Sequence, residues 1–219
     1  MRRIIASAFV SLDGVMQSPG GPEEDPTAGF RFGGWTAPYF DAALGGAMGD
    51  VFASPFELLL GRKTYDIFAA HWPNVTDPKD PIAALFNDVA KYVASRSKPT
   101  LGGRNSHLLE PDAVTALEAL KAGEGADLLV QGSGDFLQTL WKHRLVDEFT
   151  LLTFPVLLGR GKRLFGEGVV PGALKLLEAK PFTSGVILAR YRPEGEVRTG
   201  TFQRAEPSEA ELERRRDLA

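Results

Sequence analysis

The chain passes from an apolar strand into a helix at Leu58-Leu59-Leu60-Gly61-Arg62-Lys63-Thr64-Tyr65. A short apolar run that ends at a glycine and continues as a helix is typical of α/β folds. The same pattern returns where Leu128-Leu129-Val130-Gln131 leads through Gly132-Ser133-Gly134 into a second helix. Two such junctions predict a sheet of parallel strands connected by helices.

Strands and helices alternate through most of the chain. The expected strands cover residues 4–10, 56–60, 91–94, 127–130, 148–155 and 186–191. The expected helices cover residues 36–48, 62 onward, 81–89, 112–122 and 135–143. This order predicts an α/β fold with a mainly parallel central sheet flanked by helices. The last strands have no helix between them, so we expect them to pair antiparallel.

Two segments fall outside this alternation. Residues 17–34 are rich in Gly and Pro, and we expect either a functional lid or a surface insertion there. We place the folded domain at residues 1–193 and a charged extension at residues 194–219. Residues 197–202 could add a strand. The helix that begins after Ser208 is either a solvated tail or an arm that contacts a partner subunit.

Composition excludes several classes of function. The 219 residues carry a formal charge of -3, which gives no electrostatic reason to expect a nucleic-acid partner. There is no cysteine, and the three histidines lack a ligand spacing, so we expect no metal site. No apolar run is long enough for a membrane span, and the N-terminus does not resemble a signal peptide. We therefore expect a cytoplasmic protein that does not bind membranes.

Three strand ends carry residues suited to phosphate. Gly61, Arg62, Lys63 and Thr64 open one helix, Gly132, Ser133, Gly134 and Asp135 open another, and Ser95 and Arg96 follow the strand at 91–94. Free N–H groups at a helix start attract phosphate, and a Ser-Arg pair can hold a phosphate monoester. A helix cap with solvated charges is the alternative for the first junction, where the apolar strand favours phosphate, and a polar loop would look the same as the Ser-Arg pair. Together they point to a dinucleotide with an extra 2′-phosphate, although Leu137 replaces the third glycine of the Rossmann pattern.

The ordered set of motifs resembles a known family. The stretch from Gly61 to Tyr65 is similar to the one with which dihydrofolate reductases open a cofactor-binding helix. Further stretches are more similar to the reductase-domain family shared with the bifunctional deaminase-reductase of riboflavin biosynthesis. They are Ser11-Leu12-Asp13-Gly14, residues 91–96, residues 128–134, Leu145-Val146-Asp147-Glu148 and residues 154–165. The resemblance extends from Arg2 to Arg192.

The resemblance implies a dihydrofolate-reductase-like fold, NADPH as hydride donor and a homodimer. It implies reduction of a pyrimidine- or pteridine-like heterocycle, as in 5-amino-6-(5-phosphoribosylamino)uracil reductase. The three strand ends would then hold the cofactor phosphates, with Ser95 and Arg96 at the 2′-phosphate. Asp13 would lie near the nicotinamide, and Asp41 is the nearest candidate for the carboxylate that contacts the pterin in dihydrofolate reductases.

The substrate contacts are less defined. Trp35 and the aromatic residues near it could stack on a flat ring, and Arg160, Lys162 and Arg163 could bind a ribose phosphate. Core packing and a solvated basic loop explain the same residues. Asp13 could be a plain turn residue and Asp41 an exposed helical one, so the proton could come from either or from an ordered water. Dihydrofolate reductase activity, or a non-catalytic nucleotide-binding module, stays open as an alternative.

Overall fold

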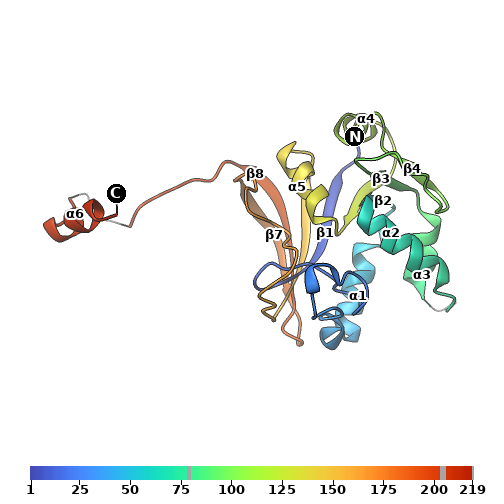
Figure 1. Ribbon diagram of the computed structural model, residues 1–219, viewed down its shortest axis with the longest axis horizontal. Helices are drawn as coiled ribbons and strands as arrows, with labels where there is room; N and C mark the ends of the chain where they lie inside the picture. The colour runs from blue at the N-terminus through green and yellow to red at the C-terminus, as the bar shows by residue number, and fades with distance from the viewer. Residues whose placement is uncertain (78–79, 203–205, 219) are drawn as a thin grey trace.

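The computed structural model describes residues 1–77, 80–202 and 206–218. Within these residues a single eight-stranded sheet is flanked by helices, and the C-terminal helix projects away from the body (Figure 1). The strands are β1 (Ile4–Ser11), β2 (Phe56–Gly61), β3 (Lys91–Ala94), β4 (Ser106–Leu108), β5 (Asp127–Gln131), β6 (Glu148–Phe154), β7 (Ala173–Pro181) and β8 (Ile187–Gly195). The α-helices are α1 (Ala42–Val51), α2 (Arg62–His71), α3 (Pro81–Asp88), α4 (Ala113–Ala122), α5 (Gly134–Lys142) and α6 (Glu209–Arg216).

The strand order is β4-β3-β2-β5-β1-β6-β8-β7. Every pair from β4 to β6 is parallel, while β8 is antiparallel to β6 and β7 is antiparallel to β8. The expected mainly parallel sheet with antiparallel C-terminal strands is therefore confirmed. The chain places β2 to β5 on one side of β1 and β6 to β8 on the other. In open α/β sheets, ligands bind beyond the carboxyl ends of the strands at such a switch point.

Alternating side chains of β1 explain why both faces of the sheet are covered. Ile4, Ala6, Ala8 and Val10 are buried in one cluster with Leu117 of α4 and with Phe136, Leu137 and Leu140 of α5. On the opposite face, α1 packs on β6 and β8, while α2 and α3 pack on β2 and β3. Strands that are buried on both faces must be apolar at nearly every position, which is the pattern of residues 58–60 and 128–130.

Several expectations about secondary structure were wrong. The helix expected at residues 36–48 is a short 3-10 turn at Ala37–Tyr39 followed by α1, because Asp41 is extended (φ -119°, ψ 177°) and caps the helix that starts at Ala42. Residues 197–202 form no strand. The short strand β4 and the strongly charged strand β7 were not predicted, since neither has the apolar pattern of a buried strand.

The irregular segment at residues 17–34 is folded back against its own ends. Gln17 donates from Nε2 to the carbonyls of Asp25 (2.9 Å) and Thr27 (3.0 Å). The indole N–H of Trp35 donates to Gln17 O (2.8 Å), and Thr36 Oγ1 donates to Pro19 O (2.7 Å). The segment is therefore an ordered covering loop and not an unstructured insertion. None of the helices in the described residues is long and apolar enough to cross a membrane.

Candidate functional site

The candidate site lies where β2 and β5 end. The two strands are parallel neighbours, with Leu59 opposite Val130, so Gly61 and Gln131 reach the same edge of the sheet. Each strand continues directly into a helix, α2 after Gly61 and α5 after Ser133. The N-termini of α2 and α5 consequently meet at one edge of the sheet. This is the edge where ligands bind in open α/β sheets.

Ser133 connects the two junctions. Its Oγ accepts a hydrogen bond from Gly61 N (2.9 Å) and donates to Thr64 Oγ1 (2.7 Å). Both Gly132 (φ +64°) and Ser133 (φ +64°) adopt the left-handed conformation, which is uncommon for a residue with a side chain. The turn therefore holds the backbone of residues 132–134 against the start of α2.

The helix caps show that these two N-termini differ from the rest. Among the described α-helices, α1, α3, α4 and α6 each begin with a side chain that accepts a backbone N–H; the caps are Asp41, Asp80, Asp112 and Ser208. Neither α2 nor α5 has such a side-chain cap. Their first-turn N–H groups are left for another acceptor, and an anion is the partner that a helix N-terminus favours.

Close packing around the glycines supports this interpretation. A Cβ at Gly61 would lie 3.0 Å from Ser133 Oγ, and one at Gly134 would lie 3.1 Å from Met16 Sδ. Side chains at these positions would collide with Ser133 and Met16, so glycine is needed for the close packing of the two junctions. The uncapped N–H groups beside this turn are what fit the residues present to the diphosphate of a dinucleotide. Asp135 is exposed in the first turn of α5, where its charge suits the helix dipole and a ribose hydroxyl more than a phosphate.

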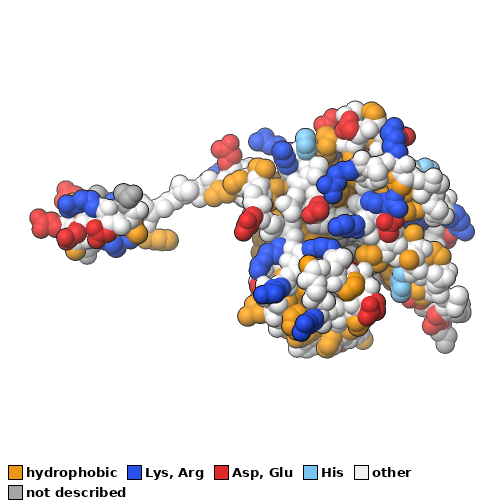
Figure 2. All heavy atoms as spheres, in the orientation of Figure 1, with side chains coloured by type: hydrophobic (Ala, Val, Ile, Leu, Met, Phe, Trp, Pro, Cys, Tyr) orange, Lys and Arg blue, Asp and Glu red, His pale blue; other side chains and the backbone are white. Residues whose placement is uncertain are grey.

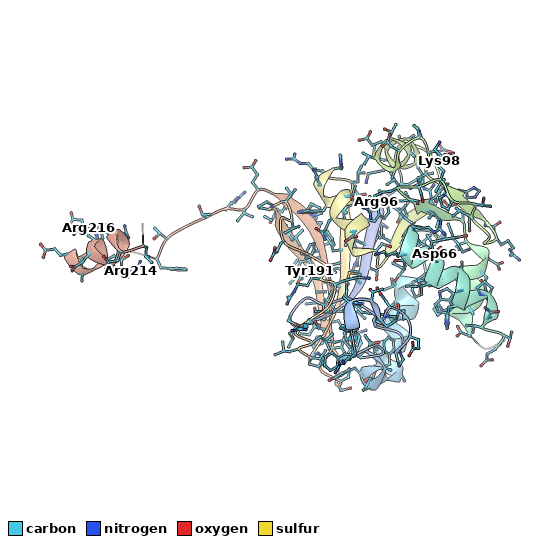
Figure 3. The ribbon with its side chains drawn as sticks, viewed as in Figure 1. Asp66, Arg96, Lys98, Tyr191, Arg214 and Arg216 are labelled. Atoms are coloured by element: carbon cyan, nitrogen blue, oxygen red, sulfur yellow. The ribbon has the colours of Figure 1, made fainter. Side chains whose placement is uncertain are left out.

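Cations surround this edge of the sheet. Figure 2 shows Lys and Arg side chains gathered between α5 and α2 on the face in view. Arg96 projects into this region (Figure 3) and forms no ion pair within the described residues. Arg62 is instead paired with Asp66 (2.7 Å), one turn along α2, and Lys63 is exposed. Ser95 accepts from Ser97 N (3.2 Å) at the end of β3, which forms a small turn that presents Arg96 to the site.

Asp13 attaches a second loop to this edge. Its carboxylate accepts from Ser11 Oγ (2.5 Å), Leu158 N (3.1 Å) and Gly159 N (2.7 Å). The Ser11 hydroxyl, followed by the two backbone donors, lowers the pKa of Asp13 to about 2. A proton donor needs a pKa near the working pH, so this carboxylate has the properties of a positioning group and not of a general acid.

Asp41 is also committed to a structural contact. Its Oδ1 accepts from Leu44 N (2.8 Å) at the start of α1, and Thr183 Oγ1 lies 3.4 Å from its Oδ2. The side chain is half-buried rather than exposed on the middle of a helix. The structure thus gives Asp41 the role of an N-cap, and it does not bring Asp41 into contact with Asp13 or with the glycine loop.

The expected substrate residues are divided between the core and the surface. Trp35 is buried, with its ring edge-on to Phe154 at 5.3 Å, so it packs in the core. Lys162 is ion-paired with Asp25 and donates its backbone N–H to Gln17 Oε1 (3.0 Å), which ties it to the covering loop. Only Arg160 faces an open space.

That space is a pocket of about 470 Å³ beside the loop that Asp13 holds. It is lined by Phe30, Arg31, Phe32, Leu158 and Arg160. Phe30 and Phe32 meet edge-to-face at 6.0 Å, so the pocket combines two aromatic rings with two guanidinium groups. Arg31 was missed from the sequence, because nothing in an irregular segment indicates that its side chain returns to face residue 160.

Comparisons with known proteins agree with this geometry. Residues 2–188 match the family model of the RibD C-terminal domain. Protein YyaP of Bacillus subtilis is 29% identical over 204 residues, which cover 89% of this chain and 96% of YyaP. A pyrimidine reductase-like protein of Corynebacterium diphtheriae has a similar structure, with a TM-score of 0.58 at 12% identity over 89% of this chain and 93% of that one.

A dihydrofolate reductase also has a similar structure. Dihydrofolate reductase of Enterococcus faecalis, solved with NADP(H), has a TM-score of 0.55 at 12% identity and covers 87% of this chain and 96% of its own. At these identities the structural likenesses establish the fold alone. The dihydrofolate-reductase-like fold that the motifs implied is confirmed.

Replacement of Asp13 by Asn tests its positioning role. The folded pKa of about 2 lies below the ordinary value of about 3.9, so ionised Asp13 stabilises the fold above about pH 4. That contribution is lost as the pH falls from about 4 to about 2. We expect Asp13→Asn to lower the free energy of unfolding by roughly 1 kcal/mol at pH 7, because an amide group then faces two backbone donors. Urea denaturation at pH 7 and pH 3 should show that Asp13→Asn loses less free energy of unfolding at pH 3 than at pH 7. The exposed Asp50→Asn variant should lose none at either pH.

A pair of substitutions separates capping from catalysis at Asp41. Asp41→Ala should cost about 1 kcal/mol of stability, whereas Asp41→Asn should cost only a few tenths, since Asn also caps helices. If Asp41 acts only as a cap, Asp41→Asn retains the reductase activity of the wild-type protein. A loss of about 100-fold in kcat with normal stability would instead make its carboxylate a proton donor.

Proposed function

Because the chain belongs to the family of the RibD C-terminal domain, we propose that it is an NADPH-dependent reductase of a pyrimidine-like heterocycle. The observation that carries the proposal is the Ser133 hydroxyl, which joins the uncapped N-termini of α2 and α5 at one edge of the sheet. Two sets of free N–H groups beside a glycine turn suit the two phosphates of a dinucleotide.

In this proposal the chain binds and orients the cofactor. NADPH, when bound, supplies the hydride. Gly61 to Thr64 and Gly132 to Gly134 hold the diphosphate, and Asp135 accepts from a ribose hydroxyl. Ser95 and Arg96 bind the 2′-phosphate, for which the unpaired guanidinium of Arg96 is the main attraction.

The aromatic and basic pocket suits a substrate with an anionic group. Arg31 and Arg160 face the same space from separate loops, and Phe30 and Phe32 provide apolar surface beside them. A sugar phosphate attached to a flat ring matches this combination, because guanidinium groups bind phosphate with paired hydrogen bonds. We therefore propose 5-amino-6-(5-phosphoribosylamino)uracil, or a heterocycle of the same class, as the substrate.

The proton for the reduction would come from water. The low pKa of Asp13 and the capping contact of Asp41 leave neither carboxylate suited to supply it. Asp13 would instead fix the backbone at Leu158 and Gly159, and through it the wall of the pocket that contains Arg160. Loss of Asp13 would then weaken substrate binding more than cofactor binding.

Two copies of the chain would associate through the edge strand β7. Leu176 and Leu177, at the irregular position of this strand, are both about half exposed (51% and 45%). Exposed leucines on an edge strand favour pairing with another chain, although the charged side chains of β7 oppose it. Helix α6 lies away from the body in Figure 1, so this helix does not cover the edge within one copy.

Turnover tests the proposed reaction. We expect NADPH oxidation with 5-amino-6-(5-phosphoribosylamino)uracil, and little with dihydrofolate, because Asp41 is engaged as a helix cap. The absorbance of NADPH is followed with each substrate in parallel. Turnover of dihydrofolate alone would assign the other reductase activity, and NADPH binding without turnover of either compound would favour a non-catalytic module.

Substitution of Arg96 tests the cofactor assignment independently of turnover. Loss of a charge-assisted contact to the 2′-phosphate should raise the Kd for NADPH roughly 10–100-fold and leave that for NADH within about twofold. Fluorescence titration of Arg96→Ala with both cofactors measures this. Lys98→Ala is the matched control, because Lys98 lies two residues on and pairs with Glu110 (3.0 Å). Equal affinity of the wild-type protein for NADPH and NADH would contradict the assignment.

A further inference from the structure

Three polar side chains stand next to one another on the face of the sheet that carries α1 and α2. Gln131 is the last residue of β5, Ser7 lies opposite it on β1, and Thr150 lies opposite Ser7 on β6. Residues in register on parallel strands point to the same side. We call Gln131, Ser7 and Thr150 the polar row.

One side chain of the polar row has a buried polar atom without a hydrogen-bond partner. The amide Nε2 of Gln131 is buried and has no partner in the described part of the chain. Its neighbours Ser7 and Thr150 are each only 3% exposed. Native proteins satisfy most buried polar groups, because an unpaired one is costly. The unpaired amide of Gln131 therefore requires an explanation.

The polar row has apolar neighbours on both sides and the glycine loop at one end. The polar row separates the two apolar clusters on this face: Ile5 and Leu129 pack toward α2, while Phe9 and Leu152 pack toward α1. It also borders the glycine loop, since Gly132 N donates to Ser7 O (3.2 Å). A ring that lay on the polar row would thus be beside the proposed cofactor site and between apolar walls.

The charge of the polar row indicates which kind of ring could bind there. Among the described residues in register with it, the charged one is Arg190, opposite Thr150, and that guanidinium is already paired with Glu148 (2.7 and 3.0 Å). The row is therefore neutral and unsuited to a phosphate or a carboxylate. A carboxamide has one donor and one acceptor side by side, which match the C=O and N–H of a cyclic amide.

We propose that the polar row binds the imide edge of a pyrimidinedione ring and that Gln131 determines specificity for it. The Gln131 amide donates to a ring carbonyl and accepts from a ring N–H, and the two hydroxyls complete the contacts. The inference rests on the proposed function for the substrate class, but it concerns the ring and not the sugar phosphate. It accounts for the unpaired Nε2 atom, which would be satisfied only when the ring is bound.

Ring binding can be measured without turnover. The ligands are 5,6-diaminouracil, which has the imide edge without a sugar phosphate, and 2,4-diaminopyrimidine, which has no ring carbonyl. They are titrated calorimetrically into the full-length protein in the presence of NADP⁺. Gln131→Met removes the amide at similar volume, and Gln131→Glu keeps its shape but removes the donor. Gln138→Met, on α5, is the matched control.

We expect both Gln131 variants to raise the Kd for 5,6-diaminouracil at least roughly 10-fold, because a site built to bond a polar edge loses its partner. The Kd for NADP⁺ and that for 2,4-diaminopyrimidine should not change. Gln131→Met should also raise the Tm of the free protein, since it removes an unpaired buried amide. A purely structural role for Gln131 would lower the Tm instead and would overturn the inference.

The remaining outcomes separate this inference from the proposed function. Normal turnover of the phosphoribosylaminouracil by Gln131→Met would overturn the inference and leave the function standing. Weakened binding of 5,6-diaminouracil by the variants, without turnover by the wild-type protein, would support the inference and overturn the reaction. Failure of the wild-type protein to bind 5,6-diaminouracil would overturn the inference whatever the turnover.

Discussion

The hydroxyl of Ser133 accepts from Gly61 N and donates to Thr64 Oγ1, and these two bonds fix one strand-to-helix junction against the other. Parallel pairing of β2 with β5 brings the strand ends to one edge, but it does not orient the helices that follow. Ser133 does so from a left-handed backbone conformation that side chains rarely adopt. The geometry of both uncapped N-termini, and therefore any anion site between them, depends on this turn.

Two other polar side chains attach irregular segments to the same edge. Asp13 accepts from the backbone of Leu158 and Gly159, and Gln17 accepts from Lys162 N while it donates to the covering loop. Backbone groups in irregular segments have no ladder or helix to satisfy them, so side chains must do it. The pocket with Arg31 and Arg160 is consequently held by contacts with its surroundings as well as by contacts among its own lining residues.

The sequence predicted the parts of the molecule that follow from periodicity and glycine placement. The buried strands at residues 58–60 and 128–130, the helices after them and the antiparallel end of the sheet were all found. The predicted start of α1 was too early. Asp41 caps this helix from an extended backbone, and the local sequence does not indicate that the chain is extended there. Strand β7 was missed because its exposed faces carry charge. The left-handed turn at Ser133, the approach of Arg31 to Arg160 and the unpaired Gln131 amide depend on long-range packing, and no local pattern marks them.

Two buried side-chain atoms of the described chain have no partner: Ser184 Oγ, in the turn between β7 and β8, and Gln131 Nε2, at the candidate site. Four α-helices of the described chain begin with side-chain caps, whereas the two without them start at the sheet edge where Gln131 lies, whose amide is also unpaired. Sequences that otherwise follow local rules tend to break them where a ligand binds. A ligand that bonds only to the folded state also stabilises it, so donors left open in the free protein become a source of stability in the complex. Donors without partners at this edge lower the stability of the free chain. The same donors would bind a nucleotide and a polar ring, so the loss of stability and the affinity have one physical origin.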